Sequence, residues 1–122
     1  LALTLSCATS AYEKSVPVRI GQTHPDLDAC TSIFAVAGLK NSSLNVRTGP
    51  GTRYPRVDSL TNDQRVWACD SARNGSWLAV VYAPLGTELD CGVTSPVSSP
   101  RTYQGPCRSG WVRAKWLVGI AG

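Results

Sequence analysis

The 122-residue chain contains no methionine and only one histidine and one phenylalanine. Charged residues make up 16% of the chain, below the quarter that is usual in globular proteins. No run of about 18 apolar residues is present, so the sequence predicts no membrane-spanning helix. The nine arginines and three lysines are scattered along the chain. The absence of a basic run argues against a nucleic-acid-binding arm.

Motifs for catalysis are also missing. Acid–base and nucleophilic catalysis each need two positioned groups, and the only histidine, His24, lies in a turn-rich segment near Asp26 and Asp28. No nucleophile motif surrounds any serine, and the segment 49–51 lacks the lysine of a phosphate-binding loop. The eight acidic residues are scattered. We therefore predict a protein that is not an enzyme, without cofactor or metal, and with His24 on its surface.

What the chain does contain is typical of a small all-β protein. Eleven glycines and eight prolines separate short stretches rich in Val, Thr, Trp and Tyr. The length corresponds to one domain. An Asn-Gly pair at 74–75 predicts a tight reversal between two strands. The segments that we expect to be extended are 16–20, 30–38, 44–47, 57–60, 65–70, 77–82, 110–113 and 117–120, with a 3₁₀ turn at 114–116.

Five cysteines occur without any C-x-x-C pair, a pattern that favours disulfides in an oxidising compartment over a zinc site. The long segment between Tyr82 and Gly110 holds Cys91 and Cys107, and a bond between them contributes on the order of 3 kcal/mol in the chain-entropy model. We predict this bond and, by elimination, Cys30–Cys69. Four cysteines still allow three connectivities. The fifth cysteine, Cys7, is left over.

The first eleven residues permit three interpretations. They form an apolar run passing into small residues, which is typical of the end of a secretory signal peptide cleaved after Ala11. The regular alternation of Leu1, Leu3, Leu5 and Cys7 is also typical of a half-buried strand. A lipid-modified Cys7 is the third interpretation, although Thr4 stands where such a motif usually has leucine.

The most informative segment is 44–55, which reads LNVRTGPGTRYP. An alternating strand runs into a turn whose glycines permit backbone angles that other residues avoid, while Pro50 fixes one dihedral between them. Together with the motifs at 74–80 and 109–112, and with Trp116-Leu117 behind them, this segment resembles the bacterial SH3 (SH3b) domain family. The resemblance covers about residues 33–120.

The resemblance implies a small SH3-like barrel of about five strands, with an N-terminal extension and a long disulfide-closed loop. It divides the chain into a signal remnant (1–11), an extension (12–32) and the SH3b-like domain (33–122). Domains of this family act outside the cytoplasmic membrane, often fused to cell-wall hydrolases. The chain is similar to free-standing exported members with four paired cysteines, some of which travel in mobile gene cassettes.

The expected function is therefore that of a non-catalytic binding module of the bacterial cell envelope. It would be periplasmic or extracellular and would recognise peptidoglycan or a peptide through an aromatic-lined surface. Its oligomeric state is left open. The candidate ligand-binding residues are Arg47, Arg53, Tyr54, Trp77 and Trp111.

Each of these residues has two interpretations. The three aromatic side chains could stack on a ligand or fill the domain's own core. Arg47 could pair with a ligand carboxylate or brace the glycine–proline loop, and Arg53 is expected to be exposed to an acidic partner. We assign Trp67 and Trp116 to the core. An alternative function is protein–protein contact or assembly through the long loop 84–107, because loops of this length are uncommon without a purpose.

Overall fold

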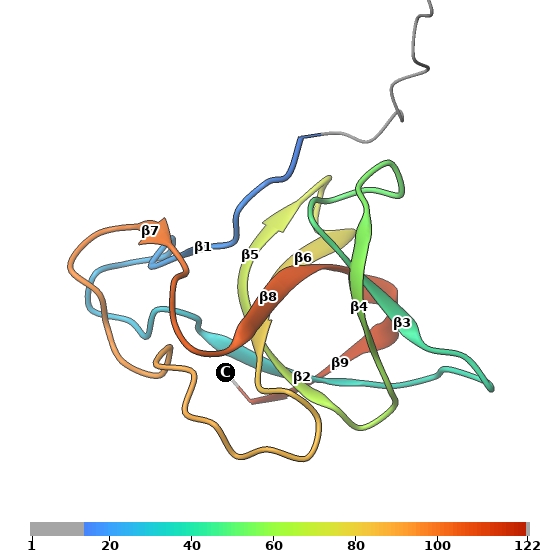
Figure 1. The fold of residues 1–122 in the computed structure, drawn as a ribbon. Helices are drawn as coiled ribbons and strands as arrows, with labels where there is room; N and C mark the ends of the chain where they lie inside the picture. The colour runs from blue at the N-terminus through green and yellow to red at the C-terminus, as the bar shows by residue number, and fades with distance from the viewer. Residues whose placement is uncertain (1–13, 122) are drawn as a thin grey trace, which may run out of the picture.

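The computed structural model describes residues 14–121, and the predictions made for residues 1–11 lie outside this range. Within it, the chain forms short β-strands and a single 3₁₀ turn (Figure 1). The elements are β1 (Arg19–Ile20), β2 (Ser32–Val36), β3 (Leu44–Arg47), β4 (Arg56–Leu60), β5 (Arg65–Ala72), β6 (Trp77–Tyr82), β7 (Arg101–Thr102), β8 (Arg108–Arg113), η1 (Ala114–Trp116) and β9 (Leu117–Ala121).

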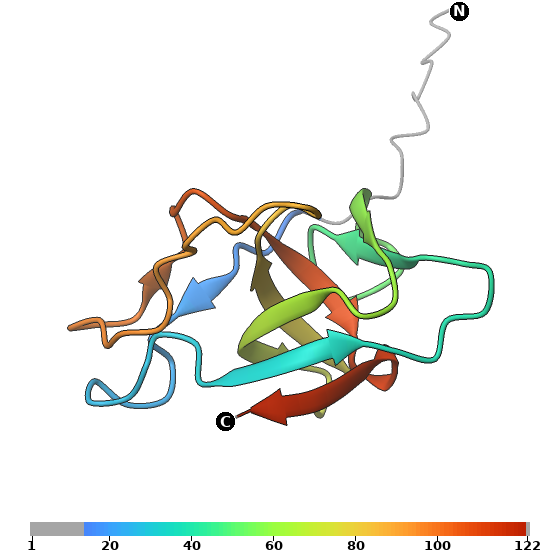
Figure 2. The same cartoon turned by 90° about the horizontal axis from the view of Figure 1, so that it is seen from below.

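The all-β prediction is confirmed. Seven strands form one antiparallel sheet in the order β4-β3-β8-β6-β5-β2-β9, and β1 pairs with β7 in a separate ribbon. The sheet has more strands than the five or so expected of a small SH3-like barrel, and each of its seven strands overlaps a segment that we expected to be extended. The sheet is curved but open, with β4 and β9 at its edges (Figures 1 and 2). No helix among the described residues is long and apolar enough to cross a membrane.

Strand β6 is buried on both faces. Its alternate residues Val80 and Tyr82 point into one cluster of buried side chains, whereas Trp77, Ala79 and Val81 point into another. We call the first cluster the sheet core; its buried members are Val36, Leu39, Leu44, Val46, Leu60, Val66, Val80, Tyr82 and Val112. We call the second the extension core; its buried members are Val18, Ile20, Ala29, Cys30, Cys69, Trp77, Ala79, Val81, Cys91, Val93, Tyr103 and Trp111.

The extension core exists because two segments outside the seven-stranded sheet pack against it. The segment 14–31 and the loop 84–107 lie on the same side of the sheet (Figures 1 and 2), where β1 and β7 hold them together. The backbone N–H groups of Ala29 and Cys30 donate to carbonyls of Ser95 and Val93. Both segments therefore belong to the folded body of the protein.

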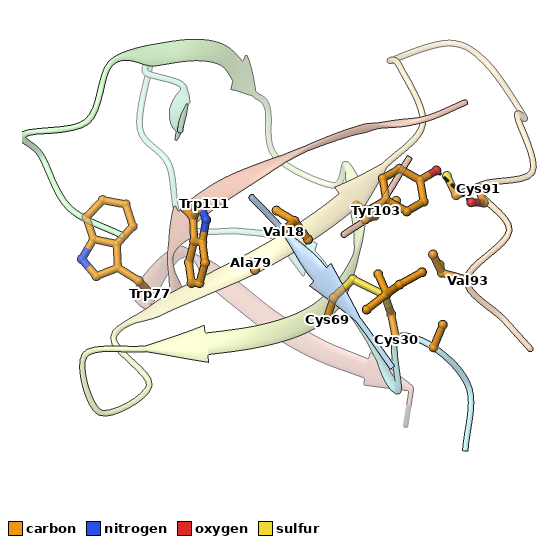
Figure 3. Close-up of a cluster of buried hydrophobic side chains, with 12 residues drawn as sticks. Val18, Cys30, Cys69, Trp77, Ala79, Cys91, Val93, Tyr103 and Trp111 are labelled. Carbon is orange, nitrogen blue, oxygen red and sulfur yellow. Dashed lines mark hydrogen bonds between the residues drawn. A yellow bond between two sulfur atoms is a disulfide. The ribbon is translucent and has the colours of Figure 1, made fainter. Parts of the chain in front are cut away.

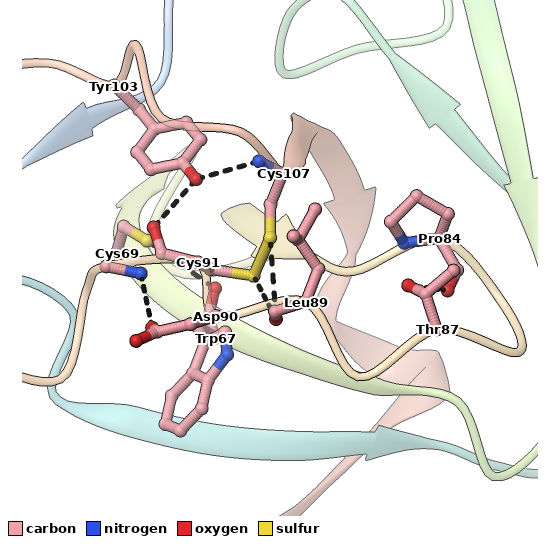
Figure 4. The surroundings of a disulfide bond; sticks show 10 residues. Trp67, Cys69, Pro84, Thr87, Leu89, Asp90, Cys91, Tyr103 and Cys107 are labelled. Atoms are coloured by element: carbon pink, nitrogen blue, oxygen red, sulfur yellow. Dashed lines mark hydrogen bonds between the residues drawn. A yellow bond between two sulfur atoms is a disulfide. The ribbon is translucent and has the colours of Figure 1, made fainter.

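Both predicted disulfides are present. Cys30–Cys69 joins the segment before β2 to β5, and Cys91–Cys107 closes the long loop. Tyr103 supports the second bond: its buried hydroxyl donates to the Cys91 carbonyl at 2.8 Å and accepts from the Cys107 N–H at 3.1 Å (Figure 4). The loop is thereby fixed both covalently and by hydrogen bonds.

The β5–β6 hairpin turns as the Asn-Gly pair predicts. Arg73, Asn74 and Gly75 all have positive φ, at 54°, 58° and 83°. The register of β5 against β6 shifts between Ala68 and Asp70, which marks a bulge at Cys69. A bulge reverses the alternation of side chains that follows it, so Val66 points into the sheet core while Ala72 packs against the extension core.

Candidate functional site

A hollow of about 280 Å³ lies between the loop 48–55 and the end of the β5–β6 hairpin. Three of the five predicted ligand-binding residues line it, namely Arg53, Tyr54 and Trp77. Two arginines that the sequence analysis did not single out, Arg73 and Arg113, complete its charged wall.

A second hollow of about 180 Å³ adjoins the first. The two share Thr52, Trp77 and Arg113 as lining residues, and we call the pair of neighbouring hollows the loop groove. The second hollow brings in a fourth predicted residue, Arg47, and also Trp116. The complete lining is Ser43, Leu44, Asn45, Arg47, Gly51, Thr52, Arg53, Tyr54, Arg73, Trp77, Arg113 and Trp116.

The loop 48–55 is held by packing and by hydrogen bonds. Neither Gly49 nor Gly51 has a positive φ, contrary to the reason that the sequence suggested for these glycines. A Cβ at Gly49 would overlap the ring of Tyr54, so this glycine provides space for the tyrosine. Arg47 donates from Nη1 to the Tyr54 carbonyl at 3.0 Å and lies 3.5 Å from that of Thr52. Arg47 therefore braces the loop as well as lining the groove.

Arg73 connects the hairpin to the loop. Its Nε donates to the Pro50 carbonyl at 2.6 Å, which joins the turn after β5 to the loop 48–55. Because this bond uses Nε alone, the two terminal nitrogens of the guanidinium stay available as donors.

Arg113 occupies the place where a ligand was expected to stack. Its guanidinium carbon lies 4.9 Å from the centre of the Trp77 ring, a cation–π contact between cross-strand partners of β8 and β6. Trp77 itself is only 4% exposed. A ligand in the groove therefore meets Arg113 above the indole and not an open indole face.

Trp111 does not reach the groove, so its assignment as a ligand-binding residue is not supported. It is 3% exposed and packs in the extension core near Val18, next to Trp77 (Figure 3). Its Nε1 donates to the Val16 carbonyl at 2.9 Å, and the Val16 N–H donates to Thr48 in the loop. Trp111 thus supports the loop from behind, through the N-terminal segment.

The two tryptophans that we assigned to the core are half-buried. Trp67 packs against the extension core, whereas Trp116 packs against the sheet core and also forms a wall of the second hollow. Sequence reasoning missed Arg113, because its place opposite Trp77 follows from the pairing of β8 with β6, which the sequence does not show. Arg73 had no signal in the sequence either, because its position depends on the positive φ of the turn.

The charged side chains that line the groove are Arg47, Arg53, Arg73 and Arg113 among the described residues. No aspartate or glutamate in the described part of the chain lines either hollow. His24 lies outside the groove and is exposed, and its Nδ1 lies 3.7 Å from Oδ2 of Asp26. No group of three or more His, Cys, Asp or Glu residues among residues 14–121 is arranged to hold a metal ion.

Searches of protein-family models, curated proteins and solved structures find no match to this chain.

Proposed function

We propose that this protein is a non-catalytic binding module of the bacterial cell envelope that recognises a peptide or peptidoglycan segment in the loop groove. The observation that carries the proposal is the groove itself, because it gathers Tyr54, Trp116 and four arginines from three separate parts of the chain. Aromatic and arginine side chains are the residue types that dominate binding energy at recognition surfaces.

The loop that forms one wall of the groove is also the segment through which the chain resembles SH3b domains. We propose that the curved sheet is an elaborated SH3-like barrel, in which β2–β6, β8, η1 and β9 correspond to the family's elements. The order of these elements along the chain, with a 3₁₀ turn before the last strand, supports this assignment. The segment 14–31 and the loop 84–107 would be additions that cover one side of the barrel.

An exported location is part of the proposal. Two disulfides are compatible with it, because such bonds persist in oxidising compartments. The envelope places peptidoglycan within reach of the protein, and the basic groove suits the carboxylates and other anions of that environment.

Retention on isolated cell walls tests the function. We expect saturable retention of the wild-type protein, and weaker retention of Tyr54→Ala, which removes the aromatic from the groove. Val57→Ala is the matched control, because Val57 is 56% exposed on β4 and does not line the groove. No retention of the wild-type protein on walls, even at low salt, would argue decisively against the proposal.

A second candidate function is protein–protein contact through the loop 84–107. The observation in its favour is that Leu85 and Leu89 are 70% and 45% exposed on this loop, where they could pack against a partner. Size-exclusion chromatography of the wild type and of a Leu85→Ser, Leu89→Ser double variant tests it. A wild-type protein that stays monomeric at high concentration and captures no partner would exclude this use of the loop.

A further inference from the structure

Arginine is concentrated in the loop groove. Arg47, Arg73 and Arg113 line its two hollows, and no acidic side chain of residues 14–121 does. The ion pairs found within residues 14–121 are His24–Asp26 and Arg108–Asp58, and neither involves these three arginines. Like charges gathered in one depression repel each other and attract an anion.

The three arginines differ in what they can offer to an anion. Arg47 has already committed Nη1 to the loop carbonyls. Arg73 is anchored through Nε, so its terminal nitrogens are held in a fixed place at the groove. A donor that is fixed before binding loses less conformational entropy when a ligand arrives.

Arg113 is positioned differently, by stacking. Its guanidinium lies over the Trp77 ring, and among residues 14–121 this contact is its only side-chain interaction. A guanidinium that stacks on an aromatic ring keeps its N–H donors in its own plane, at the edge. Arg113 also belongs to both hollows, so it stands at the centre of the groove.

We infer, building on the proposed function, that the ligand of the loop groove is anchored by a carboxylate group, with Arg113 and Arg73 as its partners. Planar guanidinium groups donate to a carboxylate through two parallel hydrogen bonds, which fixes its orientation as well as its position. Carboxylates are the anions that peptides carry, either at the C-terminus or on acidic side chains. The groove therefore selects a peptide segment that presents a carboxylate over one whose carboxylates are blocked.

The test uses one intact preparation of cell walls, which keeps its phosphate polymers, and three preparations from which phosphate polymers have been removed. The three are then treated differently. One is left untreated, one has its carboxylates converted to amides with a carbodiimide and ethanolamine, and one has its amines acetylated. We expect retention of the wild-type protein to fall at least about tenfold on the amidated walls and to be kept on the acetylated walls. Soluble acetyl-alanyl-alanine and acetyl-glutamate amide, as competitors, then distinguish a terminal carboxylate from a side-chain one.

Variants test whether the loss of retention on amidated walls depends on the loop groove. Arg113→Gln and Arg73→Gln should each lower retention on untreated walls and remove the difference between untreated and amidated walls. Arg101→Gln is the matched control, since Arg101 is exposed on β7 and lies outside the groove. Thermal unfolding of each variant checks that it is folded.

The outcomes separate the two proposals. Equal retention on untreated and amidated walls overturns the carboxylate inference and leaves the binding function in place. Retention that disappears when phosphate polymers are removed identifies phosphate as the anion and likewise overturns the inference. Failure of the wild-type protein to bind any wall preparation contradicts the proposed function itself.

Discussion

The hydroxyl of Tyr82 donates a 2.8 Å hydrogen bond to the Asp58 carboxylate, which joins the central strand β6 to the edge strand β4. The same carboxylate oxygen accepts from Arg108 on β8 at 3.2 Å, and the Ser59 N–H donates to the other oxygen. Burial alone raises the pKa of Asp58, but these hydrogen bonds and the charge of Arg108 outweigh it and lower the pKa below its ordinary value.

The first prediction concerns acid stability. Because the folded-state pKa of Asp58 is depressed, its contribution is present above the unfolded-state pKa and is lost as the pH falls through the folded-state value. We expect Asp58→Asn to cost about 1–2 kcal/mol of unfolding free energy at neutral pH, with the difference from wild type shrinking below about pH 5. Urea unfolding of wild type and Asp58→Asn, from neutral pH down to pH 2, measures this difference in unfolding free energy. A difference that stays constant down to pH 2 contradicts this account.

The same pair predicts a loss of stability in alkali. Burial, and then the Asp58 carboxylate, raise the pKa of Tyr82 well above its ordinary value of 10.0. A raised pKa contributes stability below the unfolded-state value, and this contribution falls as the pH rises above it. Between about pH 10 and pH 12, the unfolding free energy of wild type should decline more steeply than that of Tyr82→Phe. Parallel slopes for the two proteins would refute the prediction.

The third prediction compares two glycines. The three atoms nearest to a Cβ at Gly49 all belong to the ring of Tyr54, a side chain, whereas a Cβ at Gly110 meets the buried side chain of Val46 and lies 3.0 Å from a backbone atom, the Arg47 carbonyl oxygen. Gly49→Ala should therefore displace Tyr54 and weaken binding in the groove at a stability cost under about 1 kcal/mol, while Gly110→Ala should cost about 1–3 kcal/mol. Thermal unfolding and the NMR signals of the Tyr54 ring measure the two effects. A larger loss of stability for Gly49→Ala than for Gly110→Ala would contradict this prediction and show that Tyr54 is held rigidly in the loop 48–55.

The fourth prediction concerns the support behind the groove. Trp111→Phe removes the hydrogen bond to Val16 and part of the ring from the extension core. We expect a loss of about 1–3 kcal/mol and faster amide exchange at Val16, whose N–H is held by Thr48. Trp77→Phe provides the control, because Trp77 makes no hydrogen bond to this segment. Unchanged exchange at Val16 in Trp111→Phe would mean that the indole does not hold the segment.

The fifth prediction concerns the long loop. Tyr103→Phe leaves the Cys107 N–H and the Cys91 carbonyl without the partner that they share. Leaving buried polar groups unpaired costs about 1–3 kcal/mol, so the loop should open more often. We expect Cys91–Cys107 to be reduced faster by dithiothreitol than in the wild-type protein, with Cys30–Cys69 unaffected. Mass spectrometry of alkylated samples measures both rates, and equal acceleration at the two bonds would point to global destabilisation.

The strands and the disulfides were the predictable part of this structure, because local patterns determine them. Alternating residues located β3, and the Asn-Gly pair located the turn after β5. Loop length and elimination gave both cysteine pairs. The strand and turn predictions depend on neighbouring residues, and the disulfide predictions depend on the number and spacing of the cysteines. The long-range packing of the folded protein agrees with both.

The roles of individual aromatics were less predictable. Trp77 and Trp111 look equivalent in the sequence, since each begins or lies within a strand, yet only Trp77 touches the groove. The distinction depends on how the N-terminal segment covers the sheet: it buries Trp111 and supplies the Val16 carbonyl. No local sequence pattern indicates the contact between Trp111 and Val16, because these two residues are 95 positions apart in the chain.

Strand β6 contributes side chains to both cores, and this arrangement limits how the molecule can come apart. Separating the long loop from the sheet exposes Ala79 and Val81, while opening the sheet exposes Val80 and Tyr82 on the same strand. Either event therefore removes the packing from one face of β6, which is buried on both faces in the folded protein. The protein should therefore lose its structure in one cooperative transition, with the β6 amides exchanging only through global unfolding.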